Sequence, residues 1–232
     1  MLFSCKEVPD YHRMHESNKL FFYSKKFHAI YINHCDIVDL PDSIISKKAF
    51  HLMIKCSKLS DYNILLKQIN PKEIISIRID DLSNPSTTLD LTGFENLRRV
   101  MIFGNEKVKE IKLKKSGNNL KHLYLGAPFL DFPKFDSSFL NLVTLHYEGN
   151  AESVPSWVEK LDNLKNLRFT SANLSKVLLD VCKMEKLEIF DIIGNKVEDK
   201  ETHLKKSKFY PTLLKFKECK PDLKLIYRLP DY

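Results

Sequence analysis

Two histidines, His122 and His146, are expected on adjacent strands and are the residues that most readily suggest a metal site or acid–base chemistry. Zinc needs further histidine, cysteine or carboxylate ligands at short spacings, and a general base needs a nucleophile and an orienting group. No carboxylate or cysteine accompanies either histidine at such a spacing, whereas Tyr124, Thr144 and Glu148 offer ordinary hydrogen-bond partners. We therefore interpret both histidines as surface or interface residues. The sequence predicts no catalytic residue, no metal and no cofactor.

The cysteines show no spacing that is typical of a metal site or of a disulfide framework. They lie far apart, at Cys5, Cys35, Cys56, Cys182 and Cys219. The first residues lack the apolar core of a signal peptide, and no stretch approaches the roughly 20 apolar residues that cross a membrane. We therefore expect a reducing, cytoplasmic location, and secretion as an effector stays open as the alternative.

The charge balance is basic, with 37 Lys and Arg against 30 Asp and Glu, a net charge of +7. Such an excess can favour nucleic acid, an anionic membrane or an acidic protein, or it can be a solvated lysine-rich surface. Only six glycines occur, and neither a P-loop nor a dinucleotide fingerprint is present. The lysine runs lie at Lys107, Lys109, Lys112, Lys114 and Lys115, and at Lys205, Lys206, Lys208, Lys215, Lys217, Lys220 and Lys224.

A repeat of aliphatic and aromatic residues must position these side chains. Its clearest copies share apolar residues at positions one, four and six and begin 22 or 23 residues apart, at Ile74, Leu97, Leu120, Leu142, Leu164 and Leu187. Two weaker copies begin at Phe27 and Ala49, which makes eight units. Positions four and six alternate around an exposed residue, as a strand requires. Because one such strand cannot bury its apolar face alone, we expect neighbouring units to stack.

Position nine holds an asparagine in three of the eight units: Asn105, Asn150 and Asn195. The chain must bend sharply there as it leaves the strand. Such a bend would leave buried peptide groups unpaired, and each unpaired group costs about 1 to 3 kcal/mol. A buried side-chain amide can form hydrogen bonds with these groups. We therefore predict an asparagine ladder inside the stacked turns, incomplete because other units have other residues at this position.

The pattern LxxLxLxxN at this period resembles leucine-rich-repeat proteins over residues 27–197. The segments that start at Asp36 (DIVDLPDSI) and Glu152 (ESVPSWVEKLDNLKNL) are similar to repeats of intracellular immune receptors and of bacterial or protist leucine-rich-repeat proteins. The resemblance implies an α/β fold, a right-handed horseshoe-shaped solenoid. It implies a concave parallel sheet of eight to nine strands, with short or irregular helices on the convex side.

The ends of the chain are expected to close the stack, because an open repeat array exposes its core at both termini. Residues 1–26 are the predicted N-terminal cap, and residues 198–232 are the predicted C-terminal cap, with a helix over 211–218 and a ninth strand over 223–227. Between the strands, the sequence predicts helical segments at 61–69 and 175–184, a helical turn or two after Pro155 with Trp157 packed inward, and an extended segment over 126–139.

Positions three, five and seven of each strand are expected to face solvent on the concave side. Large aromatic, basic and sulfur-containing residues gather there, as in the centres of protein interfaces, although parallel sheets also prefer such side chains. The predicted binding residues are Tyr31, Met53, Arg78, Arg99, Met101, Phe103, His122, Tyr124, His146 and Arg168.

We therefore hypothesise a non-enzymatic protein–protein interaction module that binds a macromolecular partner on its concave surface. One alternative is an electrostatic binder of RNA or anionic lipid, whose affinity would fall steeply with salt. RNA sites interleave aromatic with basic residues, and here the aromatics are predicted on the other surface. A second alternative is a regulatory subunit of a phosphatase or GTPase.

Overall fold

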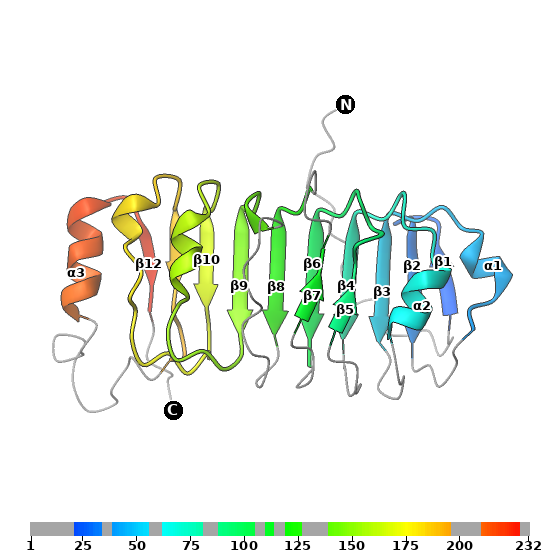
Figure 1. Cartoon of the computed structure of the whole chain (residues 1–232), viewed down its shortest axis with the longest axis horizontal. Helices are drawn as coiled ribbons and strands as arrows, with labels where there is room; N and C mark the ends of the chain where they lie inside the picture. Colours follow the sequence, from blue (N-terminus) through cyan, green and yellow to red (C-terminus); the bar gives the residue numbers. More distant parts are fainter. Residues whose placement is uncertain are drawn as a thin grey trace.

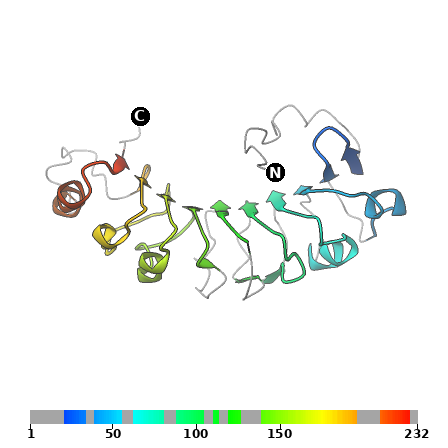
Figure 2. The ribbon, with the colours of Figure 1, turned by 90° about the horizontal axis from the view of Figure 1, so that it is seen from above.

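The structure, a computed structural model, describes residues 21–33, 39–55, 62–80, 88–104, 110–113, 119–126, 139–195 and 210–227. These residues form an α/β fold with one open sheet of ten strands. The strands lie side by side in a single layer, and helices with extended segments form a second layer along one side of it (Figure 1). Seen from above, the sheet follows a shallow arc with the helices on its outer side (Figure 2).

The sheet follows the order of the chain and is parallel except at one edge. Strand β1 pairs antiparallel with β2, and each later strand pairs parallel with its predecessor in the sheet. Its strands are β1 Phe21–Ser24, β2 Ala29–Asn33, β3 His51–Lys55, β4 Ser76–Asp80, β6 Arg99–Phe103, β8 His122–Gly126, β9 Thr144–Glu148, β10 Asn166–Phe169, β11 Ile189–Asp191 and β12 Lys224–Ile226. Each of the eight predicted units supplies one strand, and β12 is the predicted ninth.

Equivalent positions of successive units are aligned across the sheet. Val100 at position four pairs with Ile77 on one side and Leu123 on the other. The main chain repeats as well: the Arg98 carbonyl accepts hydrogen bonds from the N–H groups of Lys121 and His122, at 2.8 and 3.0 Å. The same bond pair recurs one unit later and along most of the sheet. The sequence period is therefore also the period of the hydrogen-bonded structure.

The core lies between the sheet and the outer layer. Position-four and position-six residues such as Val100 and Ile102 are fully buried in one continuous cluster that runs from Ile30 to Leu223. Positions three, five and seven project from the opposite side of the sheet, which we call the free face. Alternation along each strand thus separates the core from a candidate binding surface.

The outer layer consists of short elements. The predicted segment 61–69 is confirmed as a helix, and Pro155 caps a 3₁₀ helix in which Trp157 packs against the core and stacks on Phe139. The segment 175–184 is wrong as a helix, because only its end is helical and the rest is extended. The outer-layer elements are α1 Asp42–Ile45, α2 Tyr62–Gln68, β5 Thr88–Asp90, β7 Glu110–Lys112, η3 Ser156–Lys160 and η4 Val181–Lys183.

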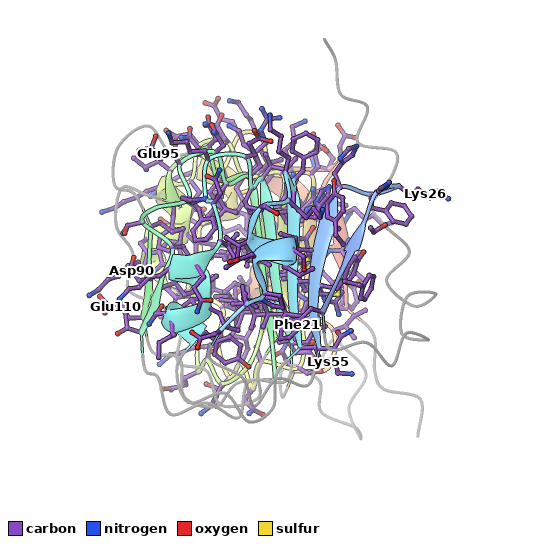
Figure 3. All side chains as sticks on the ribbon, turned by 90° about the vertical axis from the view of Figure 1, so that its right-hand side faces the viewer. Phe21, Lys26, Lys55, Asp90, Glu95 and Glu110 are labelled. Atoms are coloured by element: carbon purple, nitrogen blue, oxygen red, sulfur yellow. A yellow bond between two sulfur atoms is a disulfide. The ribbon has the colours of Figure 1, made fainter. Side chains whose placement is uncertain are left out.

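Strands β5 and β7 form a small parallel sheet that the sequence did not predict. Figure 3, viewed along the sheet from the β1 end, places Asp90 and Glu110 of these strands on the side away from Lys26. The predicted extended segment over 126–139 lies almost entirely outside the described residues.

The last units are closed by a helix and a disulfide. Helix α3 (Tyr210–Cys219) covers the predicted helical segment, and its Phe216 packs edge-on against Phe190 in the core. Cys219 forms a disulfide with Cys182 of η4, 37 residues earlier. The expectation that no disulfide forms is therefore wrong, because the fold brings together two cysteines whose spacing in the sequence indicates nothing. A disulfide persists in oxidising surroundings, so this one does not support the predicted reducing location.

The bend after several strands uses the left-handed region of backbone conformation. Gly104, Ser171 and Gly194 stand at position eight of their units and have φ angles of 76°, 48° and 73°. Glycine adopts this conformation without the steric cost of a Cβ atom. The chain can therefore turn immediately after a strand and enter the outer layer.

The asparagine ladder is confirmed at Asn195 only. Its Oδ1 accepts hydrogen bonds from the N–H groups of Ala172 (2.9 Å) and Leu174 (3.1 Å), and its amide nitrogen donates to the Ile192 carbonyl (2.7 Å) and to that of Phe169. Asn105 lies outside the described residues.

Asn150 is exposed, so its predicted ladder role is wrong. The hydroxyl of Tyr147 accepts the bond from the N–H of Asn150 at this bend, at 3.0 Å. Tyrosine at position six thus provides the buried acceptor that the asparagine provides at the last bend.

None of the helices in the described part of the chain is both long and apolar enough to cross a bilayer.

Candidate interaction surface

The free face carries one row of side chains that crosses the sheet from strand to strand. Position-five residues pair in register along eight adjacent strands, as the sequence predicted. In order they are Tyr31, Met53, Arg78, Met101, Tyr124, His146, Arg168 and Asp191. Parallel strands lie about 4.8 Å apart, so five of them from β4 to β10 place a continuous set of side chains across about 19 Å.

Three predicted binding residues are buried, and for these the expectation of exposure is wrong. Tyr31, Met53 and Met101 are 2%, 6% and 7% exposed. The ring of Phe22 in β1 stacks on Tyr31, with the ring centroids 4.3 Å apart. Because β1 folds back beside β2, its side chains cover this end of the face.

Phe27 and Ala29 complete this second, smaller apolar cluster, so Phe27 does not enter the main core as its repeat position predicted. Met101 lies elsewhere on the face, between the long side chains of Arg78 on β4 and Tyr124 on β8. The accessible part of the predicted site therefore begins at β4.

An arginine and a phenylalanine define the start of the accessible part. Arg78 forms an ion pair with Asp80, with Nε to Oδ2 at 2.8 Å, and its guanidinium lies over the ring of Phe103, 4.9 Å from the centroid. A Cβ atom on Gly126 would lie 2.5 Å from Cδ1 of Phe103, closer than real contacts allow. The absence of a side chain at Gly126 thus gives the Phe103 ring room over β8.

Each of the two histidines has a threonine hydroxyl as its hydrogen-bond partner. A ring nitrogen of His122 lies 3.2 Å from the Thr144 hydroxyl, and one of His146 lies 2.8 Å from the Thr170 hydroxyl. The ring of Tyr124 meets His146 edge to face at 6.0 Å. The described residues contain no group of three or more potential metal-ligating side chains.

Burial lowers the pKa of both histidines below the usual value, because a buried site disfavours the charged imidazole. The Arg99 guanidinium lowers the pKa of His122 further. For His146, Glu148 and Asp191 partly oppose the effect of burial. Both rings are therefore neutral near pH 7 and present one donor and one acceptor each.

We call the remaining half-buried residues the free-face cluster. They span β4 to β10 and include every accessible residue of the predicted site: Arg78, Arg99, Phe103, His122, Tyr124, His146 and Arg168. The structure thus brings seven of the ten predicted binding residues together on one accessible surface.

Two of the described lysines near the end of the chain donate hydrogen bonds to the main chain of the protein itself. Lys220 Nζ donates to the carbonyls of Met184 and Glu185, at 2.7 and 2.8 Å, and Lys217 Nζ donates to that of Leu223 at 2.7 Å. Of the first predicted lysine run, the described residue is Lys112, which lies 3.8 Å from a Glu110 carboxylate oxygen. These contacts hold the ammonium groups of Lys217 and Lys220 against the main chain and away from a docking polyanion.

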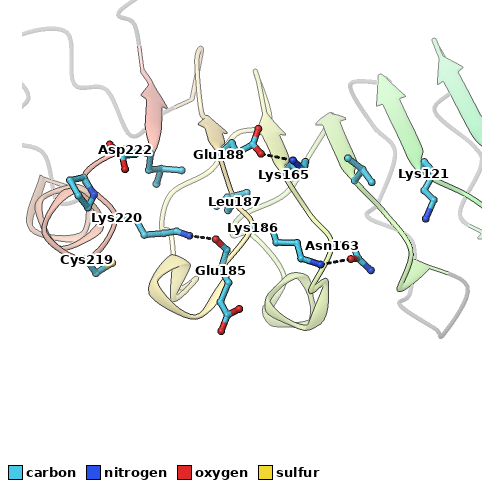
Figure 4. A pocket seen from close by; sticks show the side chains of 13 residues that line it. Lys121, Asn163, Lys165, Glu185, Lys186, Leu187, Glu188, Cys219, Lys220 and Asp222 are labelled. Carbon is cyan, nitrogen blue, oxygen red and sulfur yellow. Dashed lines mark hydrogen bonds and ion pairs between the residues drawn. The ribbon is translucent and has the colours of Figure 1, made fainter. Parts of the chain in front are cut away.

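A groove that the sequence did not indicate lies beside α3, along the beginnings of strands β8 to β11 (Figure 4). Its volume is about 810 Å³, and some of the polar side chains that line it contact one another. Lys165 pairs with Glu188 at 2.6 Å, and Lys186 donates to Asn163 at 2.8 Å.

No known protein-family model matches the chain, and a search of curated proteins finds no match. The function is therefore argued from the residues of the chain itself.

Proposed function

We propose that this chain is a leucine-rich-repeat protein, a right-handed horseshoe-shaped solenoid, that binds another protein through its free-face cluster and catalyses no reaction. The register supports the repeat assignment, because equivalent residues of successive units lie beside one another. The arc of the sheet, with the short helices on its outer side, is the arrangement that stacked units of this kind adopt (Figure 2).

The single observation that carries the binding proposal is the aligned row Arg78, Met101, Tyr124, His146 and Arg168 on five adjacent strands. Tyrosine and arginine dominate the energetics of protein interfaces, because each combines a large contact area with a directed polar group. The strands hold these groups at fixed separations, so little conformational entropy is lost when a partner docks.

The dimensions of the cluster also fit a protein partner. The row spans about 19 Å, which exceeds the 10 to 12 Å diameter of a helix with its side chains. Position-three and position-seven residues widen it on either side. A helix or a loop of a partner can therefore lie across the strands and contact several units at once.

The test is the capture of a partner from source-cell lysate by the wild-type chain and by Tyr124→Ala/Arg168→Ala. We expect this double variant to lose the captured protein, because it removes two side chains from the centre and one end of the row. Both residues are only partly buried, so the melting temperature should change little.

The matched control is Arg98→Ala/Tyr227→Ala, which removes the same two residue types from exposed positions outside the free face. It should capture the partner as the wild type does. Retention by Tyr124→Ala/Arg168→Ala, or equal loss by both double variants, would rule out the free-face cluster as the binding surface.

The electrostatic alternative has less support. Binding of RNA or anionic lipid needs lysines whose charges are available, whereas Lys217 and Lys220 donate to main-chain carbonyls and Lys215 lies 3.7 Å from Asp180. Capture that disappears between low and moderate salt, and that is unaffected by both double variants, would favour this alternative.

A further inference from the structure

Two buried nitrogen atoms on the free face lack a hydrogen-bond partner among the residues that the structure describes. They are Nδ1 of His51 on β3 and Nε of Arg99 on β6. The Nε of an arginine always carries a hydrogen. A buried donor without an acceptor costs about 1 to 3 kcal/mol. Because Nε of Arg99 is closed to solvent in this conformation, an acceptor of a partner reaches it only when the Arg99 side chain moves, and binding then recovers that energy.

These atoms belong to one position-three row. His51 pairs in register with Ser76, Ser76 with Arg99, and Arg99 with His122. Arg99 is thus flanked by a histidine on either side, two strands away in one direction and one strand away in the other. We call His51, Arg99 and His122 the basic row.

The electrostatic surroundings of the basic row are positive. Burial lowers the pKa of His51, and the nearby Arg99 and His28 lower it further. Burial, Arg99 and Lys121 act in the same direction on His122. No carboxylate contributes to either shift, and of the acidic groups on this face Asp80 is paired with Arg78.

The basic row carries one formal charge at neutral pH. Both histidines are neutral there, so the positive charge is that of Arg99 alone. A singly charged carboxylate balances one guanidinium and can accept hydrogen bonds on both of its oxygens. A phosphate dianion would place two negative charges beside the single charge of the row, and the other cation that acts on the row is Lys121, next to His122.

We propose that the basic row binds the carboxylate of an aspartate or glutamate side chain of the partner protein. This rests on the proposed function and specifies part of it: the partner segment that lies across β3 to β8 is acidic, while its neighbouring residues contact Phe103 and Tyr124. The Arg99 side chain moves so that its guanidinium, Nε included, donates to the carboxylate, and the ring N–H groups of His51 and His122 lie on either side of it.

The test uses the full chain and a hexaglutamate peptide as probe, with hexaglutamine as the uncharged control, at constant ionic strength and pH 7. NMR follows the ring signals of His51 and His122. We expect hexaglutamate to shift both signals and Arg99→Gln to weaken its binding about tenfold or more, since a hydrogen bond to a charged group is lost.

Arg98→Gln is the matched control, because it removes the same charge from the exposed neighbouring residue; its affinity should stay within about twofold of wild type. Arg99→Lys keeps the charge but lacks the planar donor geometry, and it should bind more weakly than wild type and more tightly than Arg99→Gln. A melting curve of each variant establishes that it is folded.

Equal losses in Arg98→Gln and Arg99→Gln would overturn the proposal, as would histidine signals that do not respond. Inorganic phosphate that occupies the same row more tightly than hexaglutamate would overturn the choice of a carboxylate. If a captured partner depends on Tyr124 and Arg168 but not on Arg99, the carboxylate site is wrong while the proposed function stands.

Discussion

Asn195→Ala removes a buried side chain that bonds the main chain of its own bend and of the preceding bend. Asn195 is 5% exposed, and the four shortest hydrogen bonds of its side chain all go to main-chain groups. It accepts from the N–H groups of Ala172 and Leu174 and donates to the carbonyls of Phe169 and Ile192. Alanine can form none of these bonds, and the site has no solvent access that would let water replace all of them.

The expected loss of stability follows from this inventory. Two buried N–H groups lose their acceptor, at about 1 to 3 kcal/mol each. The two carbonyls lose one donor each but keep a second lone pair, so their cost is smaller. We expect the free energy of unfolding to fall by about 4 kcal/mol, which is a large part of the 5 to 15 kcal/mol typical of a folded domain.

Urea denaturation followed by circular dichroism measures this loss. With a slope near 3 kcal/mol per M, the midpoint should shift by more than about 1 M. Asn150→Ala is the matched control, because Asn150 has the same place in its unit but is exposed; it should cost less than about 1 kcal/mol. Equal shifts in the two variants would refute the assignment of a buried ladder to Asn195 alone.

Two further predictions concern the end of the chain and its histidines. Cys182→Ser/Cys219→Ser should lower the free energy of unfolding by about 4 kcal/mol, from the loop of 37 residues that the disulfide closes. A reductant should destabilise the wild type equally and leave this variant unchanged. Burial lowers the pKa values of His51, His122 and His146 in the folded state, so the unfolded state binds more protons below about pH 6.5. Stability should therefore fall between about pH 7 and 5, and replacement of all three histidines by glutamine should flatten the decline; a wild type whose stability stays level would contradict the burial of these rings.

The sheet could be predicted from the sequence because its side chains obey a strict spacing. Residues such as Leu120, Leu123 and Leu125 recur at the same positions in every unit, and a strand with one apolar face has to pack against a similar strand. The register of Tyr124 with Met101 and His146 follows directly from that repetition. The row of side chains that forms the candidate site could therefore be predicted from the sequence alone.

Burial at the β1 end of the free face could not be predicted, because it depends on a segment outside the repeat. Strand β1 has no equivalent in the other units, and its Phe22 covers Tyr31. The Cys182–Cys219 disulfide likewise depends on where α3 lies against η4, which no spacing encodes. The small β5–β7 sheet is made of three-residue strands, too short to leave a periodic signal.

The two described asparagines of the predicted ladder show a second reason why the sequence pattern could not predict every bend. Asn150 and Asn195 have the same place in their units, yet only Asn195 is buried. The difference comes from position six, where Tyr147 carries a hydroxyl that accepts a hydrogen bond and Ile192 carries no polar atom. A pattern that treats both as apolar cannot distinguish these two bends.

The affinity of the captured partner for three forms of the chain tests the central claim most directly. Calorimetric titration with the wild type, Tyr124→Ala/Arg168→Ala and Arg98→Ala/Tyr227→Ala compares the same loss of side chains on and off the free face. Loss of two interface tyrosine or arginine contacts should weaken binding at least about 100-fold, and the control pair should remain within about threefold. Indistinguishable affinities for the two double variants would contradict a binding surface on the free face.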